Sequence, residues 1–359
     1  MLSSMSAYGY SAASRKVFAA IGLVAAAALL GGMTAGSASA ASPATHSHLH
    51  GVMPTVQKAQ AARAGHPNSV GPDILQYGGG PDGVVSGKSK VYLIFWGTQW
   101  GTSSTDSSGN LKFSNDTLGA AGRVQQMIKG LGTGGEQWSG TMTQYCDGVA
   151  YGATSCPSGV VPHVKYPTGG GTLAGVWYDN AAAAPSAASE PQIGSEAVKA
   201  AAHFGNTTAA ANRYVQYVVF SPKGTNPDNY KTNGFCAWHD VNSDLGVSSS
   251  YGLIALTNLP YLSDVGASCG AGFVNPGNNL DGYTIVEGHE YAETLTDWDP
   301  VYGWTNWSNG YQENADECAW ISSGQGKAAN VTMGNGSYPM QSTWSNDTDR
   351  CDITHVTVT

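Results

Sequence analysis

The residues with the clearest potential for chemistry lie in the short run HEYAE, where His289 precedes Glu290 and Glu293 follows one helical turn later. In a helix, residues four apart project from the same face, so the imidazole of His289 and the carboxylate of Glu293 can bind one divalent ion together. Glu290 points about 100° further around the helix axis. From there it can take a proton from metal-bound water. The spacing predicts a metal-dependent hydrolytic site.

The pattern is H-E-x-x-E, and it differs in its last position from the H-E-x-x-H of familiar zinc peptidases. The competing interpretation is a solvent-exposed helix end. There His289 and Glu293 would form a surface pair worth a few tenths of a kcal/mol. The helix itself is predicted from Asp281, as its capping residue, to about Thr296.

A second acidic segment, ENADECAW, follows the helix and contains Glu313, Asp316 and Glu317 beside Cys318. Only 11% of the chain is charged, so this clustering is unusual for the protein. A catalytic divalent ion takes three protein ligands and keeps one position open. A loop that returns to the helix can supply the third ligand from Asp316 or Glu313.

His239 in FCAWHD has two interpretations, and we expect it in a constrained loop beside Cys236. It can be a metal ligand, or a catalytic group that stabilises a developing oxyanion. The alternative is a histidine packed against Trp238 with its ring nitrogens bonded to the backbone.

Hydrophobic patterns predict the elements that position these residues. Helical spacing of apolar residues predicts helices over 115–131 and from Pro191 to Phe204. Continuous apolar runs predict buried strands over 91–96, 214–220 and 251–257, and alternation predicts another over 138–145. No regular βαβ alternation is present. The sequence therefore predicts one large α+β domain with a central sheet and an active-site helix, for which a zincin-like architecture is one option.

The N-terminal region has the composition of an export signal. Arg15 and Lys16 precede the apolar run Val17–Leu30, and Ala38-Ser39-Ala40 provides a cleavage site. The run is shorter than the roughly 20 residues of a spanning helix. We expect a signal peptide over 1–40, a flexible leader or propeptide over 41–73 and the folded domain over 74–359. The protein is therefore expected to be secreted, without a membrane span.

Charge and cysteine content restrict the kinds of partner and the disulfide pattern that we expect. The net charge is −9 and no basic patch is present, which argues against a nucleic-acid partner. Six cysteines in an exported chain indicate disulfides, with fifteen possible connectivities. Proximity favours Cys146–Cys156, while Cys236–Cys269 and Cys318–Cys351 would close loops around the candidate site. The less favoured alternative is a Cys318 thiolate that binds metal.

Several separated blocks together resemble the EXORDIUM-like (phosphate-induced) secreted proteins: QYGGGP, VYLIFWGTQW, GFCAWHD, YGLIALTNLPYLSDVGASCG, GHEYAETLTDWDP and ENADECAW. The resemblance covers roughly Ile74 to His355. Members of this family carry a similar H-E-x-A-E helix and an E-x-x-D-x-C segment, which makes Asp316 the first choice for the third ligand. The family usually reads TDP or TNP after the helix, whereas here Trp298 and Asp299 separate Asp297 from the proline. Plant members are extracellular growth-related proteins without a settled chemistry.

The favoured hypothesis is a secreted zinc metallopeptidase that acts on extracellular protein or peptide. His289, Glu293 and Asp316 would hold the ion, with Glu313 as the alternative ligand, and Glu290 would be the base. A second hypothesis is a non-catalytic cell-wall or signalling protein whose carboxylates bind a structural ion such as Ca²⁺, or a glycan. Carboxylates favour a hard ion, whereas a histidine favours zinc.

A third hypothesis is a glycoside hydrolase. It would use Glu290 with Asp316 or Glu313 as its two carboxyl groups. Nearby tryptophans would then provide a platform for a sugar: Trp304, Trp307 and Trp320.

Overall fold

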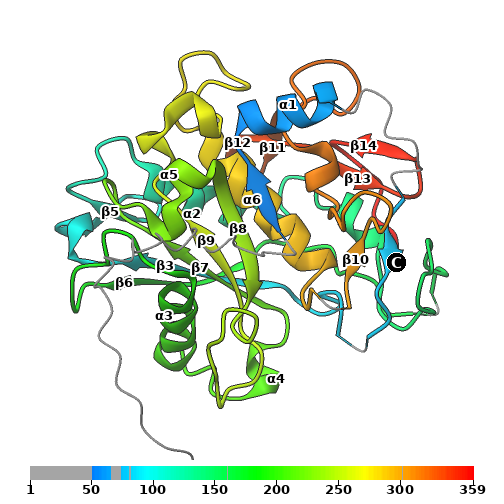
Figure 1. Ribbon diagram of the computed structural model, residues 1–359, viewed down its shortest axis with the longest axis horizontal. Helices are drawn as coiled ribbons and strands as arrows, with labels where there is room; N and C mark the ends of the chain where they lie inside the picture. The colour runs from blue at the N-terminus through cyan, green and yellow to red at the C-terminus, as the bar shows by residue number, and fades with distance from the viewer. Residues whose placement is uncertain (1–50, 66–73, 81, 160, 301) are drawn as a thin grey trace, which may run out of the picture. The chain divides into compact units, whose positions relative to one another are not determined.

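The computed structural model describes residues 51–65, 74–80, 82–159, 161–300 and 302–359. The expected signal peptide over 1–40 lies outside these ranges. The described residues are built around a six-stranded sheet with the order β1-β8-β9-β7-β3-β6 (Figure 1). Strands β6, β3, β7 and β9 run parallel, β8 is antiparallel to β9, and β1 is antiparallel to β8. The predicted α+β class with a central sheet is confirmed.

The strands of the central sheet are β1 Val52–Pro54, β3 Lys90–Trp96, β6 Leu173–Asp179, β7 Val215–Phe220, β8 Phe235–Val241 and β9 Ala255–Leu259. The two-stranded pairs are β2 Gln76–Tyr77 with β10 Trp304–Thr305, β4 Ser103–Thr105 with β5 Leu111–Phe113, β11 Ala329–Met333 with β12 Gly336–Met340, and β13 Thr343–Ser345 with β14 Arg350–Asp352.

The α-helices are α1 Val56–Gly65, α2 Ala120–Gly130, α3 Glu190–His203, α4 Ala209–Asn212, α5 Tyr230–Asn233 and α6 Asp281–Thr296. The short 3₁₀ helices are η1 Thr98–Trp100, η2 Thr141–Gln144, η3 Pro227–Asn229, η4 Leu262–Asp264, η5 Gly266–Cys269 and η6 Asp316–Cys318. None of the helices in the described ranges has the length and apolar character needed to cross a bilayer.

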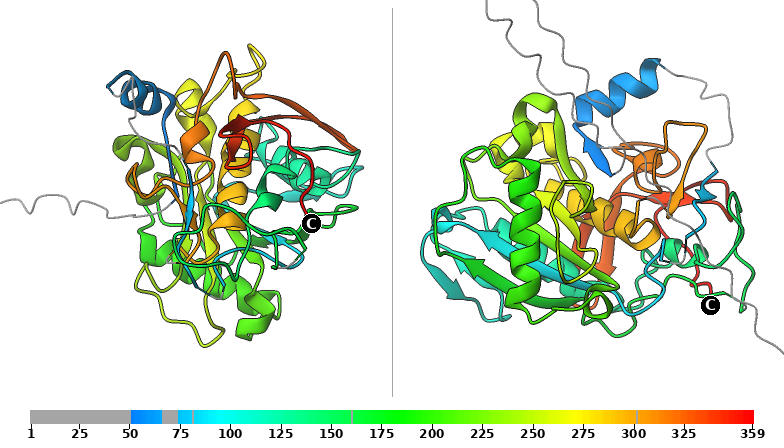
Figure 2. Two further views of the ribbon diagram at one scale, coloured as in Figure 1. Left: turned by 90° about the vertical axis from the view of Figure 1, so that its right-hand side faces the viewer. Right: turned by 60° about the horizontal axis from the view of Figure 1, so that its bottom comes forward.

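Helices cover both faces of the sheet, with α3 on one side and α2 and α6 on the other (Figure 2). The pleat of β3 explains how one strand serves two cores. Leu93 and Phe95 pack with the α6 side, whereas Ile94 between them packs with Ile193 of α3. Successive side chains of a strand point to opposite faces, so a continuous apolar run is required wherever both faces are covered.

Helix α6 is buried along its entire length, since all 16 of its residues are buried. Two glycines permit this close packing. A Cβ at Gly282 would lie 1.9 Å from the carbonyl oxygen of Cys269, and one at Gly288 would lie 2.5 Å from Cε of Met340. A solvated surface pair needs a helix face that is open to water, and α6 has none. The interpretation of His289 and Glu293 as a surface pair is therefore wrong.

The predicted strands over 91–96 and 214–220 are confirmed, as is the helix beginning near Pro191. The run over 251–257 forms a strand only from Ala255, in β9. The helix expected from 115 begins at Ala120, because the carboxylate of Asp116 accepts hydrogen bonds from the N–H groups of Ala120 and Ala121.

The strand predicted over 138–145 is wrong, because part of this segment forms the 3₁₀ helix η2. Its side chains bond locally: Thr143 Oγ1 donates to Gly140 O, and Gln144 Nε2 donates to Thr141 O. Such local bonds compete with a strand ladder. Asp281 is also not a cap. It is the first residue of α6, and its carboxylate accepts the N–H groups of Val274 and Asn275.

The expected flexible leader over 41–73 is wrong for residues 51–65, which form β1 and α1. Met53 is fully buried in the core on the α6 side, and Val56 and Ala59 pack with it. Strand β1 extends the central sheet beyond β8. The amino-acid composition of residues 51–65 gives no sign of the three apolar residues that pack into the core. The folded body therefore begins before Ile74, while residues 41–50 and 66–73 lie outside the described ranges.

All three predicted disulfides are present. Cys146–Cys156 closes a loop, Cys236–Cys269 ties β8 to η5, and Cys318–Cys351 ties η6 to β14. No cysteine is free, so the alternative of a Cys318 thiolate ligand is wrong.

A buried carboxyl pair joins α3 to the end of β6. Glu196 and Asp179 are both about 4% exposed, and Lys199 contacts the two carboxyl groups. Burial, followed by the hydrogen bond and charge of Asp179, raises the pKa of Glu196 to about 8. Folded Glu196 thus keeps a proton that the unfolded chain releases near the ordinary glutamate pKa of 4.5.

This pKa difference predicts that stability falls as the pH rises from about 4.5 to about 8, because the folded state binds more protons than the unfolded state in that window. Glu196→Gln should remove the part of this slope that Glu196 contributes. We expect little change at pH 5 and, at pH 8.5, a gain on the order of 1 kcal/mol or more over wild type. Urea unfolding at the two pH values tests this, with Asp244→Asn on the surface as control. Equal slopes in wild type and variant would contradict it.

Candidate metal centre

His289 is oriented by a side chain from the distant end of the chain. Its Nδ1 lies 3.3 Å from Oε1 of Gln341, and Nε2 of Gln341 donates to the carbonyl of Ala315 at 2.8 Å. Because the amide oxygen can only accept, Nδ1 carries the proton. In the neutral imidazole, Nε2 of His289 is then left as an electron-pair donor. This is the tautomer that a metal ligand requires.

Nε2 of His289 faces two carboxylates. It lies 3.0 Å from Oε1 of Glu293 and 3.6 Å from Oδ1 of Asp316. The backbone N–H of Asp316 donates to Oε1 of Glu293 at 3.0 Å, which fixes the returning segment on the helix. One donor atom from each of these three side chains lies within 4.8 Å of the other two. The structure thus brings together the three residues that we predicted as metal ligands.

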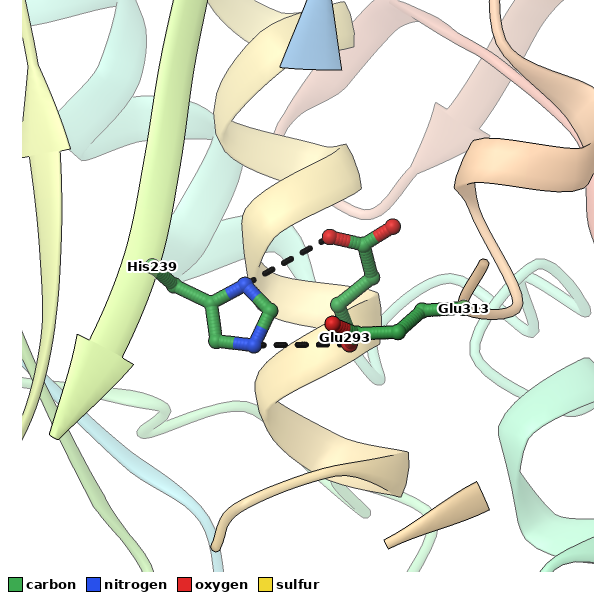
Figure 3. Close-up of side chains that lie close together, drawn as sticks. All are labelled: His239, Glu293 and Glu313. Atoms are coloured by element: carbon green, nitrogen blue, oxygen red, sulfur yellow. Dashed lines mark ion pairs between the residues drawn. The ribbon is translucent and has the colours of Figure 1, made fainter. Parts of the chain in front are cut away.

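A second ligand set shares Glu293 with the first (Figure 3). Nδ1 of His239 lies 3.4 Å from Oε2 of Glu293, and Nε2 lies 3.4 Å from Oε2 of Glu313. Nδ1 of His239 also lies 3.3 Å from Oε2 of Glu290. Glu293 therefore stands between two groups of potential ligands, one on the His289 side and one on the His239 side.

Strand β8 places His239 in this cluster, so the expected loop is wrong. His239 lies two residues from Ala237 and from Val241, which pack on the α6 side of the sheet, whereas Trp238 packs on the opposite side. Strand alternation therefore turns the imidazole toward α6. Its nitrogens face carboxylates and not the backbone. The alternative of a histidine packed on Trp238 is wrong.

The pKa values of the buried acidic groups are shifted in opposite directions. Burial raises the pKa of Glu290 to about 7, although the neighbouring His239 and His289 oppose the shift. Burial also acts on Glu293, but the two histidines outweigh it and lower its pKa to about 2. The pKa values of Glu313 and Asp316 are raised, chiefly by burial. Glu293 is thus the carboxylate that stays ionised between the histidines.

The two histidines are held in the protonated state unless another cation replaces the proton. Burial lowers the pKa of each imidazole, but nearby carboxylates outweigh it and raise both pKa values well above the ordinary value. Glu313 is the largest such influence on His239, and Glu293 on His289. A divalent ion would compete with these protons for the same nitrogens.

Buried polar atoms without hydrogen-bond partners indicate that these residues fit a metal ion. Several buried donor atoms at the centre have no hydrogen-bond partner among the described residues: Nε2 of His239 and His289, Oε1 of Glu290, Oε2 of Glu293 and both carboxylate oxygens of Glu313. Orphaned buried polar atoms are rare in native structures and point to an ion or water. Imidazole nitrogens with carboxylate oxygens suit zinc, whereas the oxygens alone suit a harder ion.

The structure brings together all six predicted site residues: His239, His289, Glu290, Glu293, Glu313 and Asp316. Their individual roles stay predictions. Glu317, from the same acidic segment, faces away, and its Oε1 accepts from Nδ2 of Asn306 at 2.7 Å. Asp297 stands at the end of α6, and neither of its carboxylate oxygens caps the helix or contacts His289.

Two further residues belong to the surroundings of the centre and were missed. Gln341 follows β12, and nothing in its local sequence connects it to a histidine 52 positions away. Glu287 lies on α6 near Glu290 with both carboxylate oxygens unpartnered, and burial raises its pKa well above the ordinary value. The available signal for Glu287 was a third glutamate on the same predicted helix, three residues before Glu290.

Comparison of the chain with family models, with curated proteins and with solved structures finds no match. The resemblance to EXORDIUM-like proteins therefore rests on the quoted motifs, and the function has to be inferred from the geometry of the centre.

The contact between Gln341 and His289 predicts that Gln341→Met lowers zinc affinity by about 10- to 100-fold, because the imidazole loses the acceptor that fixes its tautomer. Competition against a chromogenic chelator measures this affinity. Gln57→Met on the exposed face of α1 is the control. An unchanged affinity in folded Gln341→Met would show that the amide does not orient the ligand.

Proposed function

We propose that this protein is an exported, EXORDIUM-like, metal-dependent hydrolase, and specifically a zinc peptidase. The observation that supports it is the buried convergence of two histidines and four carboxylates on α6, β8 and the 313–316 segment, with donor atoms left unpartnered. Export is inferred from the N-terminal sequence and is compatible with three disulfides.

In this proposal His289, Glu293 and Asp316 would hold the ion, and the ion would supply Lewis acidity and lower the pKa of bound water. Glu290 takes the proton from the attacking water and passes it to the leaving nitrogen as the peptide C–N bond breaks. A pKa of about 7 suits this transfer near neutral pH. His239 lies within 3.3 Å of Glu290 and can orient its carboxylate.

The second ligand set admits a second ion beside His239 and Glu313, bridged by Glu293. Charge permits this arrangement, although protons on Glu290, Glu313 and Asp316, whose pKa values are raised, can neutralise the same carboxyl groups. Glu290, Glu293, Glu313 and Asp316 carry four formal negative charges when ionised, and one divalent ion would neutralise only half of them. Unpaired charge in a dry interior costs several kcal/mol per group. The number of ions bound is therefore a direct test of how far the second set is used.

One specific observation favours the alternative of a non-catalytic protein with structural ions. His289, Glu290, Glu293 and Glu313 are each 0% exposed, so in this conformation no substrate can touch them. The glycoside hydrolase receives less support. Trp304 and Trp320 are buried, and their indole N–H groups donate to the carbonyls of Cys146 and Pro54. Neither can form a sugar platform. The third tryptophan, Trp307, is half-buried, and its ring lies 4.7 Å from that of the exposed Tyr151.

The ligand assignment predicts that the purified exported protein contains at least about one equivalent of zinc, which His289→Ala loses, because the variant removes a donor that no neighbour can replace. Elemental mass spectrometry measures the content. His203→Ala, an exposed histidine on α3, is the control. Two equivalents, of which His239→Ala removes one, would support the bridged arrangement. Calcium alone would support the structural alternative, and absence of metal from every preparation would refute the site.

The role of Glu290 predicts that Glu290→Gln keeps its metal but loses hydrolytic activity by at least about 100-fold, since the amide cannot accept the proton. Cleavage of casein in the presence of zinc, with a chelator blank, is the assay. Asp244→Asn serves as a surface control. Full activity in a folded, metal-loaded Glu290→Gln protein would exclude Glu290 as the base.

A further inference from the structure

The N-terminal strand β1 lies along the outer edge of β8, the strand that carries His239. Val52 pairs with Trp238 and Met53 with Ala237, in antiparallel register. One residue further, the backbone N–H of His239 donates to the carbonyl of Gly51 at 3.0 Å. The ladder thus continues from β1 up to the residue whose imidazole enters the metal centre.

Gly51 lies directly against the ring of His239. Its φ is +60°, a conformation that side chains rarely adopt, and a Cβ added there would lie 2.1 Å from Nδ1 of His239. No residue larger than glycine fits this path without displacing the ring or the strand. The segment therefore closes the centre from the side of the sheet edge, which accounts for part of the burial of His239.

The same segment also binds the opposite wall of the centre. The carbonyl of Pro54 accepts the indole N–H of Trp320 at 2.7 Å. Arg63 of α1 donates to the carbonyls of Ala319 and Trp320 at 2.5 and 3.1 Å. Residues 51–65 thus bridge β8 on one side and the end of the 313–320 segment on the other. None of these contacts is covalent, since the disulfides begin at Cys146.

We propose that the β8 edge is the binding site for an extended peptide substrate, and that residues 51–54 occupy it in the full chain as an internal, inhibitory ligand. This inference rests on the proposed function. A strand edge offers backbone donors and acceptors that any extended peptide can match, whereas a glycan cannot reproduce such a ladder. A peptide in the place of β1 would run antiparallel to β8 and bring its backbone to His239 and Glu290.

The geometry accounts for a centre that is complete yet closed. The ligands and the base are assembled, but the backbone of the chain itself lies where a substrate must enter. Activity therefore requires that β1 leaves the edge while β8, α6 and the 313–316 segment stay in place. The disulfides at Cys236 and Cys318 hold the two walls through that departure.

Two substitutions in the full-length protein test this. Gly51→Val places a side chain against His239, and Met53→Asp places a charge at a fully buried position. Both should release β1 from β8. Gln60→Ala, exposed on α1, is the matched control. Near-ultraviolet circular dichroism verifies that each variant is folded, and because the two substitutions act differently, one is informative if the other fails to fold.

The first readout is independent of metal and activity: binding of a fluorescent synthetic peptide with the sequence of residues 51–65. We expect binding to the two variants at least about tenfold tighter than to wild type or to Gln60→Ala. The second readout is casein cleavage with zinc present, expected to rise at least about tenfold in the same variants.

The outcomes separate this inference from the proposed function. Peptide binding by the variants without cleavage by any protein form would support the edge as a peptide site and overturn the hydrolase. Equal cleavage by wild type and variants would overturn the inhibitory role and leave the hydrolase standing. Folded variants that do not bind the peptide would overturn the edge as the binding site.

Discussion

The cost of burying charge is the constraint on which the rest of this structure depends. Helix α6 carries three glutamates and a histidine through the centre of the protein with none of them exposed. A carboxylate withdrawn from water costs several kcal/mol unless it is neutralised or bonded. Three groups compensate the buried charge of Glu293: the imidazoles of His239 and His289 and the backbone N–H of Asp316.

The groups around Glu293 come from separate parts of the chain. Strand pleating sends His239 toward α6, a disulfide fixes the 3₁₀ helix of Asp316, and Gln341 holds the imidazole of His289 at its rear nitrogen. Contacts of this kind, made from behind a side chain, are what hold metal ligands rigid at known metal sites.

The part of the site that sequence could predict is the part carried by local spacing. His289, Glu290 and Glu293 share one helix, and the 313–316 cluster stands out in a chain with few charges. Gln341 could not be found, because its contact depends on tertiary packing. The strand β8 was missed because Cys, Trp, His and Asp conceal its apolar pattern. The ordered segment 51–65 was missed for the same reason, since only Met53, Val56 and Ala59 hold it in the core.

The order of the disulfides along the chain has a consequence for biogenesis. Each cysteine is bonded to the next cysteine in sequence, with separations of 10, 33 and 33 residues. If the chain is exported N-terminus first, as proposed, it completes each pair before the next pair appears. No cysteine has to bypass an earlier partner, and closing short loops has the smaller entropic cost. Oxidation can thus proceed in the order of translocation, without reshuffling by an isomerase.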